Sequence, residues 1–512
     1  MSNIFRFLFN FMPVLLILSA VWMVLGINFD GFPHFEGDEG IYASRAWAYA
    51  YEGTLSAGEY IYDHPPAGWM FIGKWFRATN SDVLFSSLLH SGRFFILLLN
   101  ALSALFLYKV AEKLTANKVL GVAAALLFVF SPLEVYFGRR ILLDNIVNFW
   151  MLFSLFVYLV IPNRFLSILL SAVFFAVAVL TKENAVMFLI PYVILVASYK
   201  SKEPSARFSI YGKLTFTKDV LTWLLIFTSV VSIYPLMALV RGEFLPSGYF
   251  DNGGDPSLLS TLSFQMGRGK SGVFDFENNP FWEQINLWVD EDPILFGLGL
   301  FSVLGNLYVY YKKRITVALV LALFIIFQML FLMRGGIVFE FYILPLVPFF
   351  SLGIVFVLSQ LAKMLSEDIK QLPQQYFVLF VLPLVLATFV SSLIIRNRSP
   401  YTTRSSDAQI NAINWIKENV SEDAVIITDS FAKGDLYKKK HLTLKSQFDA
   451  EYDPSFREAV EAGETQVDYI IYTKQIEWDL DTLDFVRGIL ENSTLVESFE
   501  ASEWDVSIYK TS

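Results

Sequence analysis

The sequence has no cysteine and few charged residues, and both features limit the classes of protein to which it can belong. None of its 512 residues is Cys, which excludes a disulfide framework, a thiolate metal site and a catalytic cysteine. Charged residues make up 17% of the chain, below the roughly 25% of an ordinary soluble domain. Apolar residues make up 55%, including 50 Phe, and this excess argues against a soluble enzyme.

The charge that the chain does carry is acidic and unevenly placed. Its net charge is −9 although its mean hydropathy is +0.50. Residues 401–512 hold 22 Asp and Glu but 11 Lys and Arg, so the acidity belongs to this tail and the first 400 residues are nearly neutral. An acidic balance also argues against nucleic acid as a partner.

Near-continuous apolar runs recur through the first 400 residues, each near the length of about 20 residues that crosses a lipid core about 30 Å thick. Eleven such runs lie near residues 7–28, 91–111, 117–137, 145–161, 165–181, 185–199, 220–240, 293–311, 315–333, 338–361 and 375–396. The first is too long for a signal peptide and lacks a small-residue cleavage site, so we interpret it as an uncleaved span. The pattern predicts a polytopic α-helical membrane protein with about eleven transmembrane helices, surrounded by membrane lipids.

Lysine and arginine indicate the orientation. They collect in the connection over residues 200–218 and in the Lys-Lys-Arg turn at residues 312–314, which fall on one side when eleven spans are threaded. Because such residues favour the cytoplasmic side, we expect the N-terminus inside and the C-terminus outside the cell membrane. The long loops 29–85 and 241–292 are then also outside.

The tail has a different pattern from the rest of the chain. Short apolar runs at residues 424–427 and 469–472 read as strands, and they alternate with helical patterns such as residues 407–419. We therefore expect two domains: a transmembrane catalytic domain over residues 1–400, and a small extracytoplasmic α/β domain over residues 401–512.

Three outward-facing places hold polar residues that membrane proteins rarely keep without a function. The first is the loop after the first run, with Asp38, Glu39, Tyr42 and Arg45, and then Asp63-His64-Pro65-Pro66. A structural interpretation is open for both segments, because a carboxylate such as Asp38 often caps a helix and proline favours a first helical turn.

The second place is the connection between the third and fourth runs, which contains Arg139, Arg140 and Asp144. An arginine pair at this depth can hold a phosphate through paired hydrogen bonds. The alternative is that the arginines extend to lipid head groups while Asp144 caps the next helix.

The third place combines two connections, one with Lys182 and Glu183 and one with Arg334 and the nearby Tyr342. With the threading above, nine ionisable groups arrive at one face of the membrane: Asp38, Asp63, His64, Arg139, Arg140, Asp144, Lys182, Glu183 and Arg334. Together they predict a site for an anionic lipid with a carboxylate base nearby.

The order of these segments resembles that of the GT-C glycosyltransferases, in particular the branch of protein O-mannosyltransferases and aminoarabinose transferases. The resemblance covers roughly residues 7–350. It implies the GT-C fold and a reaction on the outer face of the membrane. In this reaction a hexose or pentose is transferred, with inversion, from a polyprenyl-phosphate sugar donor to an acceptor hydroxyl of a glycan, lipid or protein. His64 stands where the aminoarabinose branch has lysine, which favours the mannosyltransferase side.

The resemblance also implies roles for the candidate residues. Asp38 is the expected base, assisted by Glu39, and Asp144 is expected to help hold the donor sugar or the acceptor. The remaining candidates are expected to bind the donor phosphate (Arg139, Arg140, Lys182, Arg334 and His64) or the substrate (Asp63, Tyr42, Arg45, Glu183 and Tyr342).

Two questions stay open at this stage. No cofactor is required, because cations can neutralise the leaving phosphate, but Asp38, Asp63, His64 and Asp144 are of the types that could hold a divalent metal. The function also has two alternatives. Charged groups in a membrane protein suit a secondary transporter or lipid flippase, and the chain could instead be a catalytically silent membrane scaffold.

Overall fold

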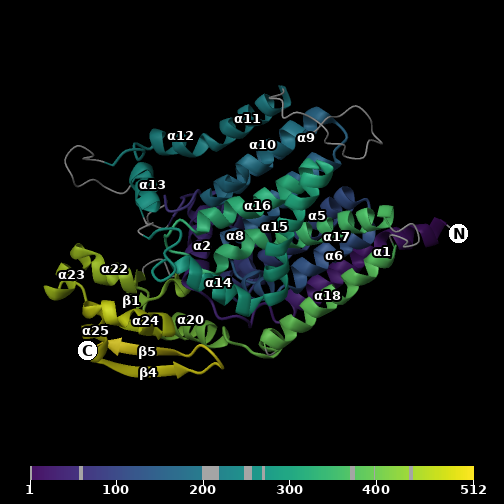
Figure 1. Ribbon diagram of the computed structural model, residues 1–512. Helices are drawn as coiled ribbons and strands as arrows, with labels where there is room; N and C mark the ends of the chain where they lie inside the picture. Colours follow the sequence, from purple (N-terminus) through teal and green to yellow (C-terminus); the bar gives the residue numbers. More distant parts are fainter. Residues whose placement is uncertain are drawn as a thin grey trace.

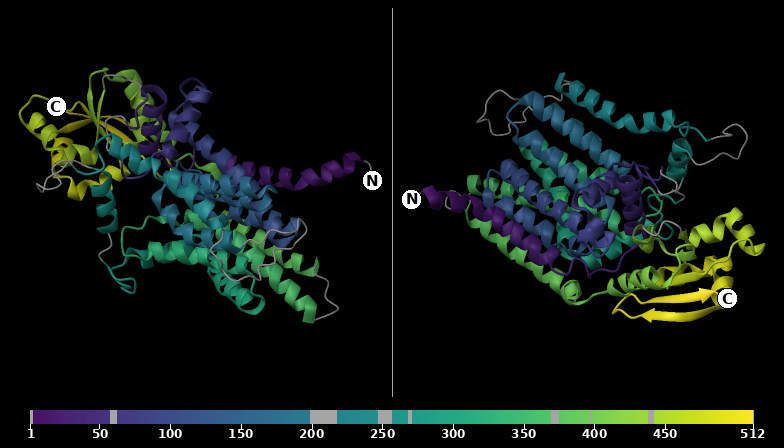
Figure 2. Two further views of the ribbon diagram at one scale, coloured as in Figure 1. Left: turned by 90° about the horizontal axis from the view of Figure 1, so that it is seen from above. Right: turned by 180° about the vertical axis from the view of Figure 1, so that it is seen from behind.

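The computed structural model describes residues 3–56, 62–198, 218–246, 257–267, 271–368, 375–396, 398–437 and 442–511. Within these ranges the chain forms a long helical body with a sheet at one end, and the two termini lie at opposite ends of the molecule (Figures 1 and 2). Apolar helices build the body: α1 Asn3–Val21, α5 Leu88–Thr115, α6 Lys118–Phe130, α8 Leu143–Val160, α9 Arg164–Thr181, α10 Leu189–Ser198, α11 Lys218–Val231, α12 Ile233–Val240, α15 Pro293–Lys313, α16 Thr316–Leu332, α17 Val347–Asp368 and α18 Gln375–Ile395.

Shorter elements connect these helices. They are η1 Trp22–Gly26, α2 Gly37–Trp47, η2 Ala48–Glu52, α3 Ala67–Thr79, α4 Ser81–Leu84, α7 Pro132–Phe137, η3 Glu183–Phe188, α13 Leu258–Gly267, α14 Pro280–Glu291 and η4 Glu340–Leu346. The expected outer loops 29–85 and 241–292 are therefore largely helical where the structure describes them.

Each of the eleven apolar runs falls on a helix, but the count of eleven spans is not confirmed. Six helices in the described residues are long and apolar enough to cross a membrane, or seven if the bent pair that begins at Val381 is one span. Proline explains part of the difference, because its ring cannot continue a helix. The run at 117–137 breaks at Pro132 into α6 and α7, and α6 with its 13 residues is too short to be counted as a span.

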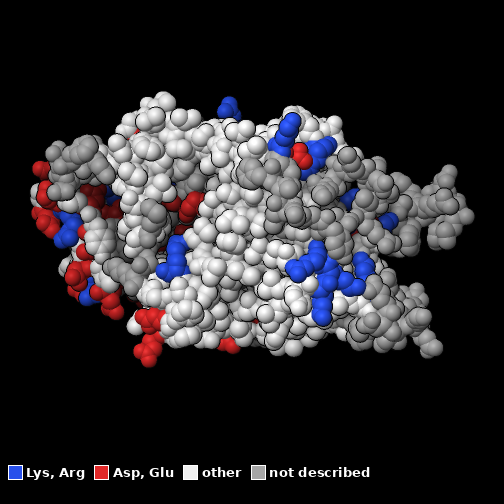
Figure 3. Space-filling view, turned by 45° about the horizontal axis from the view of Figure 1, so that its top comes forward, with Lys and Arg blue, Asp and Glu red and all other residues white. Residues whose placement is uncertain are grey.

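Charge divides the two ends of the molecule. Acidic side chains gather at the end that carries the sheet, whereas the charged side chains on the opposite half of the visible face are mostly basic (Figure 3). Lys312 and Lys313 end α15, and Arg314 follows in the connection to α16. The expected basic connection with Lys200, Lys202, Arg207 and Lys213 lies outside the described residues, so the predicted orientation stays a prediction.

The C-terminal part contains a five-stranded mixed sheet with the strand order β2-β1-β3-β5-β4. The strands are β1 Val425–Thr428, β2 Thr443–Ser446, β3 Tyr469–Thr473, β4 Ser493–Phe499 and β5 Val506–Thr511, and the two runs that we read as strands form β1 and β3. β1 pairs in parallel with β2 and β3, with Ile427 opposite Lys445 and Ile470, whereas β5 runs antiparallel to β3 and β4. The surrounding helices are α19 Ser399–Thr402, α20 Asp407–Asn419, η5 Ser430–Ala432, α21 Lys433–Leu436, α22 Gln447–Tyr452, α23 Pro454–Glu461, α24 Lys474–Asp479, η6 Leu480–Thr482 and α25 Asp484–Glu491.

The C-terminal part packs directly against α2 and the segment before it. Gln409 on α20 accepts a hydrogen bond from the Phe35 backbone N–H at 2.7 Å and donates one to the Phe35 carbonyl at 2.9 Å. Apolar side chains of both parts share one buried cluster, which includes Tyr42, Phe431 and Ile413. The sheet is therefore continuous with the core that surrounds α2.

A fully buried ion pair fixes α2 to the helical body. Arg93 on α5 donates to both carboxylate oxygens of Glu39, at 2.9 and 2.8 Å, and both side chains have no exposed surface. The Ile141 backbone N–H donates to the same carboxylate at 3.0 Å. A buried charge is tolerated when it is paired and hydrogen-bonded in this way.

Replacing Glu39 with Gln will leave the Arg93 charge buried without its partner. We expect the variant to lose about 3–5 kcal/mol of stability, detected as a lower melting temperature in detergent. Glu112→Gln is the matched control, because the Lys109–Glu112 pair is partly exposed and such pairs contribute about 0–1 kcal/mol. Equal melting temperatures for the two variants would contradict the anchoring role of Glu39.

Candidate active site

The candidate site starts at the N-terminus of α2. Glu36 caps this helix: its side chain accepts the backbone N–H of Glu39, while the Glu39 side chain accepts the N–H of Glu36 at 3.2 Å. This reciprocal pattern starts the helix at Gly37 and places Asp38 in the first turn, where free backbone N–H groups favour a carboxylate. The interpretation of Asp38 as the cap is therefore wrong, because Glu36 has that position.

A cavity of about 140 Å³ lies beside Asp38. Its walls come from α2, the segment before α3, the α9–η3 junction, α13, the end of α16 and η4. The lining residues selected from the sequence are Asp38, Tyr42, Asp63, His64, Lys182, Glu183, Arg334 and Tyr342, and the others are Ile41, Asn184, Gln265, Phe331, Ile337 and Phe339. Eight of the thirteen candidates, which lie far apart in the sequence, thus meet at one cavity.

Two ion pairs shape the wall formed by the segment before α3. Arg45 Nη1 donates to both oxygens of Asp63 at 2.8 and 2.9 Å, and its guanidinium lies over the Trp69 ring. His64 Nδ1 lies 2.8 Å from Glu183 Oε2. Arg45 therefore acts on the cavity through Asp63, and the orientation of His64 is fixed by Glu183.

A third ion pair holds a cation at the α9–η3 junction. Lys182 Nζ lies 2.6 Å from Asp144 Oδ2, and both side chains are buried. The ammonium also lies 4.4 Å from the centre of the Tyr342 ring. Burial works against the ammonium charge, but the Asp144 carboxylate outweighs it and raises the pKa of Lys182. Lys182 is therefore a permanent cation at the cavity, and Asp144 acts behind it.

Asp38 differs from the other carboxylates around the cavity. Asp63, Glu183 and Asp144 each have a cationic or imidazole partner, whereas no hydrogen bond to the Asp38 side chain exists within the described residues. Burial raises the pKa of Asp38, and the nearby Lys182 and His64 offset part of this effect. A carboxylate without a partner, facing a cavity and with a raised pKa, has the properties of a general base.

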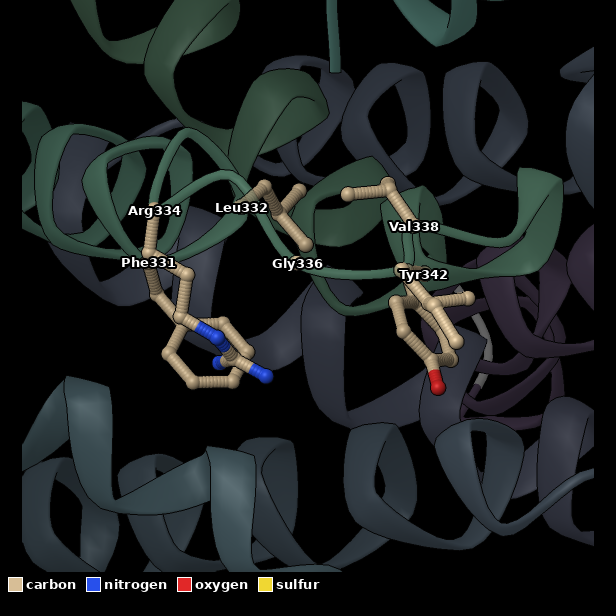
Figure 4. A pocket seen from close by; sticks show the side chains of 7 residues that line it. Phe331, Leu332, Arg334, Gly336, Val338 and Tyr342 are labelled. Atoms are coloured by element: carbon tan, nitrogen blue, oxygen red, sulfur yellow. The ribbon is translucent and has the colours of Figure 1, made fainter. Parts of the chain in front are cut away.

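Arg334 reaches the cavity from the turn after α16. Gly335 makes this turn with φ of +81°, a conformation that favours glycine, and it packs against Ser271. The Arg334 guanidinium lies over the Phe331 ring, 3.8 Å from its centre. Figure 4 shows Arg334 and the Tyr342 hydroxyl extending to the same side of the chain.

Five of the selected residues do not line the cavity. Arg45 and Asp144 act through their partners, and the expected roles of the other three need correction. The Glu39 carboxylate accepts hydrogen bonds from Arg93 and from two backbone N–H groups. Both of its oxygens are therefore occupied, and neither is free to accept a proton from a substrate. Arg139 donates to the carbonyls of Val24 at 2.6 Å and Pro400 at 2.8 Å. Arg140 is fully buried, pairs with Glu36 and donates to the Tyr136 hydroxyl. These arginines hold the fold together instead of meeting a phosphate.

The four metal candidates are not arranged around a common point. Asp63, His64 and Asp144 each face a different partner, and the described residues contain no group of three or more Asp, Glu, His or Cys side chains placed to hold a metal ion. These residues therefore do not fit a metal centre in this arrangement.

Several residues that line the cavity have no signal in the sequence. Gln265 on α13 lies in the long segment 241–292, but nothing in the local sequence distinguishes it from other polar residues. Phe331 and Phe339 belong to apolar stretches and give no indication that they border a polar cavity. Only the close approach of α13, α16 and η4 to α2 brings them to the site.

The His64–Glu183 pair makes stability depend on pH. Burial lowers the pKa of His64, but the Glu183 carboxylate outweighs it and the pKa is raised above its usual 6.5. Because the folded value exceeds the unfolded one, the pair adds its full stabilisation below about pH 6.5, and loses it as the pH rises through the folded value. We expect the melting temperature in detergent to fall over that range, and His64→Gln to reduce this fall. An identical pH dependence in both proteins would contradict the pairing.

Comparisons with known proteins concern the fold and one segment of the sequence. Residues 63–234 match the family model described as dolichyl-phosphate-mannose-protein mannosyltransferase. The structure is similar to ArnT from Cupriavidus metallidurans bound to undecaprenyl phosphate, with a TM-score of 0.60, 13% identity and 98% of each chain covered. It is also similar to the oligosaccharyltransferase of Archaeoglobus fulgidus, with a TM-score of 0.57, 14% identity and coverage of 100% of this chain and 75% of the other.

A search of curated proteins finds no match. At 13–14% identity the structural similarity establishes the fold, and the family model independently covers the segment from Asp63 through Lys182 and Glu183. Both findings confirm the resemblance inferred from the order of the charged segments. The chain has the fold of the GT-C glycosyltransferases, and its residues 63–234 carry the pattern of the dolichyl-phosphate-mannose-protein mannosyltransferase family.

Proposed function

We propose that the protein is an inverting membrane glycosyltransferase, which moves a sugar from a polyprenyl-phosphate carrier to an acceptor hydroxyl of a glycan, lipid or protein. One observation carries the proposal: the Asp38 carboxylate, without a hydrogen-bond partner in the described residues, faces the same cavity as the cations Lys182 and Arg334. A base and cations around one space suit a reaction that removes a proton and releases a phosphate.

The proposed reaction is a single displacement. Asp38 takes the proton of the acceptor hydroxyl while the acceptor oxygen forms a bond to the anomeric carbon. The bond between that carbon and the phosphate oxygen breaks, and its electron pair leaves with the polyprenyl phosphate. Attack opposite the leaving group inverts the anomeric configuration.

Lys182 and Arg334 stabilise the phosphate as its charge develops, and His64, when protonated, adds to them. Cations already in place when the charge forms need no reorganisation during the reaction. They supply the neutralisation that a metal would otherwise provide, so the proposed reaction needs none. Asp144 keeps Lys182 in position, and Asp63, Tyr42 and Tyr342 offer groups that can hydrogen-bond to sugar hydroxyls.

The relatives support a lipid-phosphate donor. The ArnT structure holds undecaprenyl phosphate, and a further structure of the Archaeoglobus fulgidus enzyme AglB, similar at a TM-score of 0.56, holds dolichol phosphate and an inhibitory peptide. The family model describes transfer from dolichyl-phosphate mannose, which makes mannose the first donor to test. We place the reaction on the extracytoplasmic face of the cell membrane, following the charge distribution of the loops.

Asp38→Asn tests the base. The amide keeps the size of the side chain but cannot accept the proton, so we expect kcat to fall about 10²–10⁴-fold with little change in the melting temperature. The assay is transfer of labelled sugar from polyprenyl-phosphate mannose by purified protein.

The pH profile gives a second readout for the same group. Because Asp38 acts in its ionised form and its pKa is raised, wild-type activity should fall on the acidic side at a pH above the value of about 4 for an ordinary carboxyl group. Normal transfer by Asp38→Asn would eliminate it as the base. Lipid transport in proteoliposomes without any sugar transfer would favour a transporter instead.

Arg334→Gln tests the phosphate contact. Loss of one cation at the leaving group should lower kcat/KM about 10²-fold and weaken binding of polyprenyl phosphate, measured by competition with the labelled donor. Arg77→Gln on α3 is the matched control, because Arg77 is exposed and does not line the cavity. Equal donor binding by both variants would remove Arg334 from the proposed site.

A further inference from the structure

The helix that carries Asp38 touches the C-terminal part through its backbone. Gly40 lies on α2 against η5, where an added Cβ would overlap the Ser430 carbonyl oxygen and lie 2.5 Å from Phe431 Cα. Gly434 on α21 faces α2 from the other side, and a Cβ there would lie 3.2 Å from the Ser44 backbone nitrogen. Since the neighbouring atoms are backbone, no side-chain rotation can relieve either contact.

The turn that meets α2 is itself firmly attached to the sheet. Asp429 follows β1 and accepts hydrogen bonds from Thr473 Oγ1 at 2.6 Å and from the Phe431 backbone N–H at 3.0 Å. Thr473 ends β3, so this carboxylate joins the turn to two strands of the sheet. Asp435 accepts the Leu88 backbone N–H at 3.1 Å, which connects α21 to the start of α5.

The chain leading into α2 is held by the same C-terminal part. Gln409 makes two hydrogen bonds to the Phe35 backbone. The His34 ring stacks on Trp504 between β4 and β5, with 3.8 Å between ring centres and 6° between planes. α2 and its entry segment are thus fixed from one side by residues more than 370 positions later in the chain.

We infer that the segment from Ser430 to Gly434 of the C-terminal part positions Asp38 for catalysis. This inference rests on the proposed function, because it assigns a positioning role for the same site. Neither Gly40 nor residues 430–434 line the cavity, so they act through α2 and not on the substrate. A displacement of about 1 Å in a reacting group can reduce the rate about 10²-fold, which makes close backbone packing an effective control of activity.

Three glycine-to-alanine variants with different available space test the inference. Gly40→Ala meets backbone atoms at overlapping distance, Gly434→Ala meets them at 3.2 Å, and Gly37→Ala is the control because its nearest neighbour is Ser430 Cβ at 3.9 Å. All three lie in helices, where the backbone preference favours alanine over glycine. The measurements are kcat and donor KM, the pH profile, the melting temperature and hydrogen exchange of residues 37–47.

We expect kcat to fall about 10²-fold in Gly40→Ala, by an intermediate factor in Gly434→Ala, and not at all in Gly37→Ala. Donor KM should change little, because Lys182 and Arg334 come from other elements, and the acidic limb of the pH profile should shift with the surroundings of Asp38. If Gly40→Ala does not fold, the kcat of Gly434→Ala tests the positioning role instead.

The outcomes separate this inference from the proposed function. Active wild-type protein with equal kcat in all three variants would overturn the positioning role and leave the proposed function intact. A wild-type protein that transfers no sugar, together with hydrogen exchange of α2 that is faster in Gly40→Ala and Gly434→Ala but not in Gly37→Ala, would support control of α2 by the C-terminal part and overturn the glycosyltransferase proposal.

Discussion

The arrangement of the cavity depends on one buried arginine. Arg93 binds both oxygens of Glu39, donates to the carbonyls of Pro33 at 2.7 Å and His34 at 3.1 Å, and lies 4.1 Å from the centre of the Phe35 ring. It therefore holds the entry segment and the first turn of α2 against α5 at once. Because a buried guanidinium must have all these partners, the position of Asp38 follows from the place of Arg93 in the helical body.

The charged residues divide into two groups with different tasks. Arg93, Arg139 and Arg140 are buried, and they satisfy carboxylates, carbonyls or a hydroxyl where helices meet loops. Lys182 and Arg334 border the cavity, and each of them also lies against an aromatic ring. Both groups look alike in the sequence, since each is made of cations within or next to apolar runs. Their surroundings distinguish them, because only Lys182 and Arg334 line the cavity.

Much of the fold could be predicted from the sequence because apolar length and strand alternation are local properties. All eleven runs form helices, and residues 425–428 and 469–473 form strands near the expected positions. The errors have local causes too. Pro132 divides one predicted span, and the capping box of Glu36 replaces the expected cap at Asp38.

The sequence by itself determined that this is an apolar, multi-span chain with an acidic tail, and that Asp38, His64, Lys182 and Arg334 belong near one site. Only the tertiary structure shows which carboxylate at the cavity has no hydrogen-bond partner among the described residues. Glu39 and Arg93 are 54 positions apart, and His64 and Glu183 are 119 apart. Partners at such separations are set by helix packing, so the pairing of the carboxylates around the cavity cannot be identified until the helices are in place.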